Sequence, residues 1–298
     1  MKNYNITKNK TKTLLVPLAI IVIGLVFFII KGFNFDIEFL GGIRMEVQMD
    51  GAVNTSEISD YLEQETGINP IIVQTTSSGV SIKTQPIEEE MKNQIFEKMQ
   101  EKYGLEDDAL LSVSSASASY GKQTQAKTVL FTLIAMLCIL IYIAIRFEWR
   151  SAVMAIISLF VNILVMMAVY AIFQIPLNTT FIAAMLTVVG YSINDTIVIF
   201  DRIRENMRGY NPKKNGTISD VVNLSINECI GRTIGTSVTT LVTILLLYII
   251  GVNAVKEFAL PLLIGITCGT FTSMFVATPF WGAWKDAERE AKAVAKKN

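Results

Sequence analysis

Six long apolar stretches constrain this chain more than any other feature of its sequence. A helix needs about 20 residues to cross a hydrocarbon core roughly 30 Å thick, and each stretch is close to that length. Only 51% of the 298 residues are apolar, so the stretches reflect clustering rather than an unusual overall composition. The sequence therefore predicts an α-helical membrane protein with six transmembrane helices. The stretches cover residues 14–30, 129–145, 152–173, 181–200, 234–252 and 258–280.

Basic residues in the short connections predict the orientation of these helices. Four lysines precede the first stretch, six Lys or Arg residues lie between the fourth and the fifth, and five lie in the C-terminal tail. The connections on the other side carry at most one basic residue each. The positive-inside rule then places both termini in the cytoplasm. Because no small-residue cleavage site follows the first stretch, it is interpreted as an uncleaved anchor.

The insert 31–127 is predicted to be a small folded domain outside the cytoplasm. It holds sixteen acidic and eight basic residues, and its hydrophobic pattern changes between strand and helix periods. The resulting order β-α-β-β-α-β is that of a ferredoxin-like α+β domain. The expected elements are strands at 43–49, 71–74, 80–83 and 110–113, helices at 56–66 and at 87–103 after Pro86, and a turn at 77–79.

These patterns divide the chain into four parts. The divisions are a cytoplasmic N-terminus with the first helix at 1–30, the extracytoplasmic domain at 31–127, helices two to six at 128–283, and a charged cytoplasmic tail at 284–298.

Composition excludes several classes of function. Histidine is absent, which removes imidazole-based catalysis and metal binding. Lys plus Arg and Asp plus Glu both number 26, so no overall positive charge favours nucleic acid. The three cysteines have no paired spacing, and the sequence contains neither a phosphate-binding loop nor a nucleophile elbow. We therefore expect no enzyme, no catalytic residue, no metal and no organic cofactor.

Asp195 is the most informative single residue, because it lies inside the fourth apolar stretch. A charge at the centre of a membrane helix costs roughly 2.5 to 3.5 kcal/mol on insertion scales, so such residues usually have a function. Counted from the end of the stretch at about 1.5 Å per residue, Asp195 is buried but close enough to the cytoplasm to be reached. Two roles are open at this point: ion coupling, or hydrogen bonding between helices.

Arg232 begins the fifth apolar stretch and heads a polar stripe of Thr236, Thr239, Thr240 and Thr243 at helical spacing. If the fourth and fifth helices are neighbours, the guanidinium reaches Asp195 and favours its ionised form. Arg232 could equally be a positive anchor at the membrane edge, and the threonines could serve helix packing. In the sixth stretch, Gly265 and Gly269 form a close-packing face, which we expect to meet a second six-helix half.

Three segments resemble the SecF family of protein-export membrane subunits. Residues 188–206, with the sequence VVGYSINDTIVIFDRIREN, are similar to the signature of that family's fourth helix. Residues 227–240 resemble the start of its fifth helix, and 33–47 its glycine-rich motif after the first helix. The family's usual Asp-Phe-Thr-Gly-Gly is here Glu38-Phe-Leu-Gly-Gly, so the shorter acid and the hydroxyl are lost, whereas the two glycines that permit a tight turn remain.

The resemblance implies one half of a twelve-helix assembly of the resistance-nodulation-division superfamily, completed by SecD in the bacterial cytoplasmic membrane. Such an assembly uses the proton-motive force, or in some members sodium, to assist late steps of protein translocation outside the SecYEG channel, with SecYEG and exported unfolded proteins as its partners. Carried over to this sequence, Asp195 is the carboxylate on the ion path and Arg232 its modulating cation. Asn194, Thr236, Thr239 and Thr240 are our candidates for supporting polar residues.

Two other functions remain open from the residues. A half-sized exporter of small molecules or lipids would use the same scaffold and would need a substrate pocket. A non-transporting assembly subunit would need Asp195 only for packing.

Overall fold

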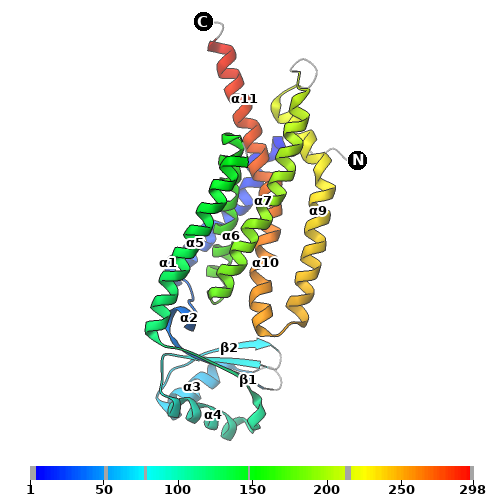
Figure 1. The fold of residues 1–298 in the computed structure, drawn as a ribbon. Helices are drawn as coiled ribbons and strands as arrows, with labels where there is room; N and C mark the ends of the chain where they lie inside the picture. The colour runs from blue at the N-terminus through cyan, green and yellow to red at the C-terminus, as the bar shows by residue number, and fades with distance from the viewer. Residues whose placement is uncertain (1–4, 50–52, 77–78, 147, 212–215, 296–298) are drawn as a thin grey trace. The chain divides into compact units, whose positions relative to one another are not determined.

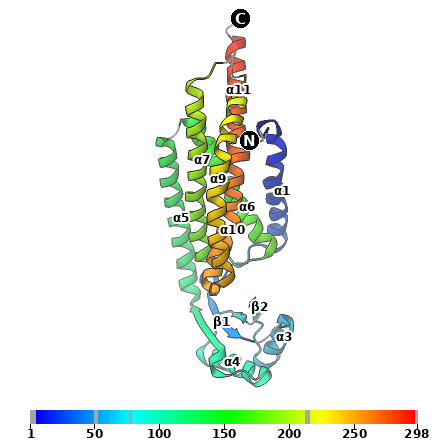
Figure 2. The ribbon, with the colours of Figure 1, turned by 90° about the vertical axis from the view of Figure 1, so that its right-hand side faces the viewer.

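The computed structural model describes residues 5–49, 53–76, 79–146, 148–211 and 216–295. It divides into two compact units (Figures 1 and 2). The helical unit comprises Met1–Phe33, Thr132–Ile175 and Thr180–Asn298, and the α/β unit comprises Asn34–Phe131 and Pro176–Thr179.

Six helices of the described chain are long and apolar enough to cross a membrane. In the fourth to sixth of these, the helix extends well beyond the apolar stretch. The sixth is continuous from Asn253 to Ala295, although its central turn is a π-helix. The helices are α1 (Lys10–Lys31, after η1, Thr7–Asn9), α5 (Ala118–Arg146), α6 (Trp149–Phe173), α7 (Thr179–Arg208), α9 (Ile218–Ile250), and α10 (Asn253–Thr272), η3 (Ser273–Ala277) and α11 (Thr278–Ala295).

The helices continue into polar sequence outside the apolar stretches, because polar residues can also form and cap helices. The side chain of Thr217 accepts a hydrogen bond from Asp220 N, and that of Asp220 accepts one from Thr217 N, so α9 begins with a capping box far ahead of its apolar stretch. The charged tail expected at 284–298 is helical as far as Ala295. An apolar stretch therefore marks only the part of a helix that suits the membrane.

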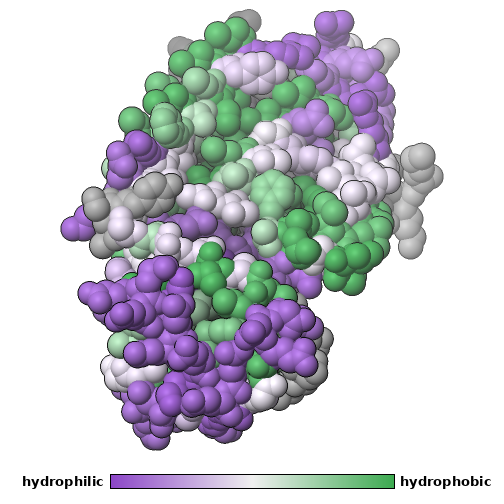
Figure 3. All heavy atoms as spheres, turned by 60° about the horizontal axis from the view of Figure 1, so that its bottom comes forward, coloured by the Kyte–Doolittle hydropathy of each residue, from purple (hydrophilic) through white to green (hydrophobic). Residues whose placement is uncertain are grey.

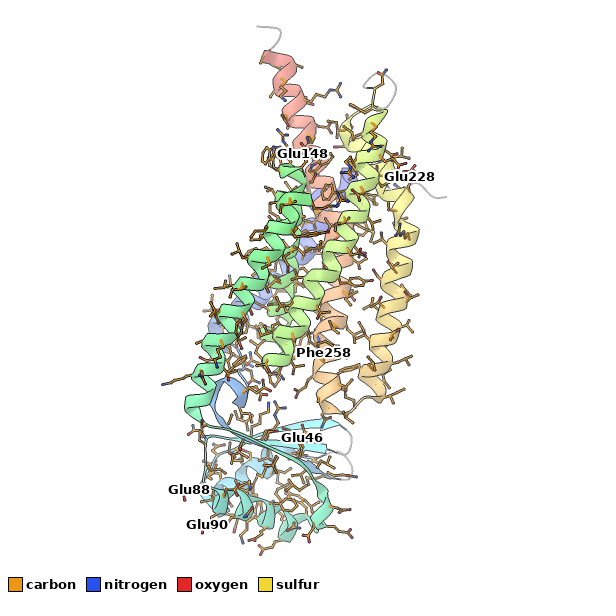
Figure 4. The ribbon with its side chains drawn as sticks, in the orientation of Figure 1. Glu46, Glu88, Glu90, Glu148, Glu228 and Phe258 are labelled. Carbon is orange, nitrogen blue, oxygen red and sulfur yellow. The ribbon has the colours of Figure 1, made fainter. Side chains whose placement is uncertain are left out.

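Charged residues gather at one end of the helical unit, where α6, α7, α9 and α11 meet (Figure 4). Glu148 lies just before α6 and forms ion pairs with Lys285 at 2.6 Å and with Arg150 at 3.2 Å. Arg150 also pairs with Glu288 at 2.8 Å. Burial on its own would raise the pKa of Glu148, but these two cations outweigh it and hold that pKa below its ordinary value.

Asp286 of α11 connects this end to α9. Its carboxylate accepts hydrogen bonds from Ile218 N at 2.7 Å and from Ser219 N at 2.9 Å. These are the first amides of α9, which have no partner within the helix, so an acid at this point is favourable.

The α/β unit contains one antiparallel sheet and two longer helices. Its strands follow the order β2-β3-β1-β4, with Met45 of β1 opposite Ile82 of β3 and Val113 of β4. The elements are α2 (Ile37–Leu40), β1 (Gly42–Gln48), α3 (Thr55–Thr66), β2 (Ile71–Thr76), β3 (Gly79–Thr84), α4 (Glu89–Tyr103), η2 (Asp107–Ala109) and β4 (Leu110–Ala116).

The alternation in β1 produces the core of this unit. Ile43, Met45, Val47 and Met49 are all buried, and they pack with residues of α3, β3 and α4. Hydrophilic residues gather on the outer surface of the unit, whereas hydrophobic ones lie along the helical unit (Figure 3).

One predicted boundary in this unit is wrong, and one part of it is not described. The helix α4 begins at Glu89 rather than just after Pro86, because Glu88 is extended and acts as its N-cap. Two further acids then occupy the first turn of α4, where the helix dipole favours them. The turn predicted at 77–79 lies largely outside the described residues.

Candidate functional site

Asp195 lies on the buried face of α7. Ser192, Asp195 and Thr196 follow one another at helical spacings of three and four residues, so they share one side of the helix. Each of the three is at most 3% exposed within this chain. The sequence places them between apolar residues, and the fold turns this polar face toward α10.

Two hydroxyl groups from other helices connect to the carboxylate. Thr270 of α10 donates a hydrogen bond from Oγ1 to Asp195 Oδ2 at 3.2 Å. Ser237 of α9 lies 2.7 Å from Thr270 Oγ1 through its own hydroxyl oxygen. All three residues are buried, so a chain of polar groups joins α7, α10 and α9 in a region without bulk water.

The π-helix η3 extends this arrangement by one more hydroxyl. Ser273 Oγ lies 2.9 Å from Thr196 Oγ1 and 3.3 Å from the carbonyl oxygen of Ser192. Asn162 of α6 donates to Ser192 Oγ at 2.8 Å. π-Helical turns often occur at functional sites. We call these buried residues the polar cluster: Asn162, Ser192, Asp195, Thr196, Ser237, Thr270 and Ser273.

Gly265 and Gly269 allow α10 to approach α7 this closely. A Cβ atom at Gly269 would overlap Ser192 Oγ and the amide of Asn162, and one at Gly265 would overlap the side chain of Val188. The two glycines therefore pack against a helix of the same chain. The expectation that this face meets a second six-helix half is wrong, because the small residues are already used to bring Thr270 to Asp195.

Arg232 does not contact Asp195 in this structure. Its side chain is exposed, and in the described part of the chain no ion pair or hydrogen bond joins the two residues. The reason is geometric: Arg232 precedes Ser237 by five residues, which places the two about 140° apart around α9. The face of α9 that meets Asp195 is thus not the face that carries the guanidinium.

The predicted supporting residues lie outside the polar cluster, three of them exposed and Thr240 half-buried. Asn194 is exposed on α7, next to Asp195 in the chain but on another side of the helix. Thr236 and Thr239 are exposed on α9, and each donates its hydroxyl to a carbonyl oxygen of the preceding turn. Thr240 does the same and also accepts a weak hydrogen bond from Tyr191 at 3.4 Å.

Sequence reasoning missed the hydroxyl partners of Asp195 because α9 has polar residues on two faces. Thr233 and Ser237 form the second face, at a spacing of four residues, and both are buried. Thr270 and Ser273 lie three residues apart in the sixth apolar stretch, which also places them on one side of a helix. A search for small hydroxyl residues at helical spacing in both stretches would have found them.

Asp195 is the one acidic residue of the polar cluster. The cluster contains this carboxylate surrounded by hydroxyl groups and one amide, and no group of three or more metal-binding side chains occurs in the described residues. A buried carboxylate without a cationic partner is more stable once a proton or a small cation has neutralised it.

The glycine-rich motif after α1 joins the connection between α6 and α7. Glu38 accepts two hydrogen bonds at Oε2, from Thr179 N at 2.8 Å and from Thr179 Oγ1 at 2.6 Å. Asp36 N donates to Leu177 O at 2.9 Å. Gly41 and Gly42 both have positive φ, of 80° and 142°, so they make the turn that leads into β1. The longer acid at position 38 thus serves as the cap of α7, the helix that carries Asp195.

Replacing Glu38 by Ala is expected to lower the melting temperature of the purified protein by about 2–5 °C. The substitution removes two charge-assisted hydrogen bonds at a helix N-terminus, which contribute on the order of 1–2 kcal/mol. Thermal unfolding in detergent measures the change. Glu63→Ala, at an exposed position of α3, is the matched control and should leave the melting temperature unchanged. Equal melting temperatures for both variants would contradict the cap.

Comparison with known proteins places these features in one family. The family model described as protein export membrane protein SecD/SecF, C-terminal, matches residues 95–287. The chain is 34% identical to protein translocase subunit SecF of Alicyclobacillus acidocaldarius, over 90% of this chain and 88% of the relative. It is 31% identical to protein translocase subunit SecDF of Bacillus subtilis, over 91% of this chain but only 36% of that relative.

The fold agrees with this match. The crystal structure of SecDF from Thermus thermophilus, which its description calls a translocon-associated membrane protein, superposes with a TM-score of 0.86 at 28% identity. The superposition covers 95% of this chain and 39% of that one. With most of the chain matched in sequence and in fold, this membrane protein belongs to the SecF family of protein export membrane proteins.

Proposed function

We propose that this chain is an accessory subunit of the Sec protein translocase that works with SecD and uses a proton or sodium gradient to assist protein export. The observation that carries the proposal is Asp195, a carboxylate that is 3% exposed in a membrane helix and has hydroxyl partners but no cationic partner in the described chain. The names of its relatives support the translocase role.

Coupling requires that the occupancy of the site differ between two conformations. One charge that crosses the membrane potential supplies roughly 2.3 kcal/mol per 100 mV. When its ion leaves, Asp195 is a buried anion, and it then needs a compensating charge. Arg232 can supply that charge in a conformation in which α9 has turned or moved. Arg232 and Asp195 are apart in the present structure, which on this proposal corresponds to the state in which Asp195 holds its ion.

SecD is the proposed partner. Arg232, Asn194 and Thr239 lie within or beside apolar stretches and are exposed, and polar side chains at such depth usually face protein or water rather than lipid. The relatives named SecDF support this assignment, because the chain matches little more than a third of their length.

The proposed orientation follows from the charged end of the helical unit. Under the positive-inside rule this end, which holds Arg146 and Arg150, lies in the cytoplasm, together with both termini. The α/β unit then lies outside the cytoplasmic membrane. Its strand order suits a ferredoxin-like domain. Its two edge strands, β2 and β4, are the surfaces we propose for unfolded proteins that leave SecYEG.

Collapsing one gradient at a time in proteoliposomes tests the coupling. The vesicles contain this chain with SecD and SecYEG and a preprotein whose protected fraction is measured. We expect that dissipating one gradient, of protons or of sodium ions, removes the stimulation that this chain and SecD provide, and that dissipating the other does not. Stimulation that survives the loss of both gradients would favour the non-transporting assembly role.

A further inference from the structure

A groove of about 740 Å³ runs along the helical unit between the N-terminal segment and α9. Its lining includes Asn9 and Thr13 of the N-terminal segment, Gly231, Gly235 and Val238 of α9, and Phe275 of η3. This volume lies within the range of pockets that hold small molecules. We call this feature the α9 groove. None of its residues belongs to the polar cluster.

The chain itself does not fill the α9 groove. A Cβ atom at Gly231 or at Gly235 would meet no other atom within 4 Å, in contrast to Gly265 and Gly269. Val238, one turn further along α9, is 49% exposed. Because this part of α9 belongs to an apolar span, an apolar ligand suits the groove.

Lysines flank the N-terminal residues that line the α9 groove. Lys8 and Lys10 are the chain neighbours of Asn9, Lys12 precedes Thr13, and the first acidic residue of the chain is Asp36. The positive charge of Lys8 attracts the carboxylate of Asp220. Lys10 and Lys12 form no ion pair in the described residues. A lysine next to a membrane attracts anionic lipid headgroups, and salt weakens that attraction.

We propose that the α9 groove binds an anionic phospholipid. An acyl chain lies against Gly231, Gly235 and Val238, and the phosphate group lies beside Lys10 and Lys12. A neutral lipid would fill the apolar part as well but would gain nothing from the lysines. A transmembrane helix of a partner is the other conceivable occupant. It would use the glycines but would leave the flanking lysines without a role.

Native mass spectrometry of the full chain in detergent tests the proposal, with SecD present if it is retained. Phosphatidylglycerol and phosphatidylcholine with the same acyl chains are added in turn. We expect about tenfold tighter binding of phosphatidylglycerol at low salt, with a preference that falls as salt is raised. The triple variant Lys8→Gln, Lys10→Gln, Lys12→Gln should bring the two lipids close to equal binding. Equal binding by the unmodified chain would overturn the proposal without any variant.

Two further variants locate the lipid. Gly235→Leu places a side chain in the open groove and should lower the binding of both lipids at least threefold. Cys268→Leu is the matched control, because it fills a second groove of about 500 Å³ between α1, α6 and α10, whose lining residues have no basic neighbour in the chain. The proposal fails if Cys268→Leu lowers phosphatidylglycerol binding as much as Gly235→Leu does. It also fails if SecD, when bound, excludes the lipid completely, since the occupant would then be a partner helix.

Discussion

We expect that replacing Asp195 by Asn abolishes the gradient-dependent part of protein export and leaves the assembly with SecD intact. Asparagine keeps the shape of the side chain and one acceptor for Thr270, but it can neither lose a proton nor attract a cation. We expect export in proteoliposomes to fall to the level seen with the gradient collapsed. Co-purification with SecD measures the assembly.

The matched control for this variant is Asp201→Asn on the same helix. Asp201 is partly exposed and forms ion pairs with Arg146 at 2.9 Å and with Arg204 at 3.0 Å, outside the polar cluster. Its replacement should leave gradient dependence in place. If the assembled Asp195→Asn complex responds to the gradient like the unmodified one, the coupling mechanism is refuted and the carboxylate is a packing residue.

Arg232→Lys is expected to retain part of the gradient-dependent export, because the positive charge survives while the planar guanidinium is lost. The same proteoliposome assay measures it. Full loss would show that the shape of the guanidinium, and not only its charge, is needed. Full retention would indicate that Arg232 acts only as an anchor at the membrane edge.

Gly269→Leu should have the largest effect on stability. The new side chain would overlap Ser192 and Asn162, so α10 and α7 must separate. Overpacking of this kind typically costs about 1–3 kcal/mol, and the broken Asn162 to Ser192 hydrogen bond adds to it. We expect a melting temperature lower by at least about 5 °C in detergent, or failure to accumulate.

Gly190→Leu is the matched control for Gly269→Leu. Gly190 also lies in a membrane helix, but a Cβ atom there would meet no atom within 4 Å. In the isolated chain the melting temperature of Gly190→Leu should stay within about 2 °C of the unmodified protein. Similar losses for both variants would mean that leucine disturbs the helices themselves rather than one contact.

Features carried by a single segment could be predicted from the sequence. The six apolar spans and Asp195 are local signals, because clustering and an isolated charge are visible without knowing which helices are neighbours. The alternation of Ile43, Met45 and Val47 likewise predicts a half-buried strand.

Features that depend on packing could not be predicted in the same way. The stripe headed by Arg232 and the face that carries Ser237 are both plausible partners for Asp195. The choice between them depends on how α9 is rotated against α10, and no pattern within α9 reports that rotation. The role of Gly269 was equally ambiguous, since a small-residue face suits a helix of the same chain or of another.

The continuous helix from Asn253 to Ala295 has a mechanical consequence. Its 43 residues span about 65 Å, roughly twice the hydrocarbon thickness of a bilayer, so about half of its length stands outside the membrane as a lever arm. A tilt of about 10° at the membrane would displace a point 30 Å further along by about 5 Å. Because Asp286 holds the first turn of α9, such a swing would carry the start of that helix with it.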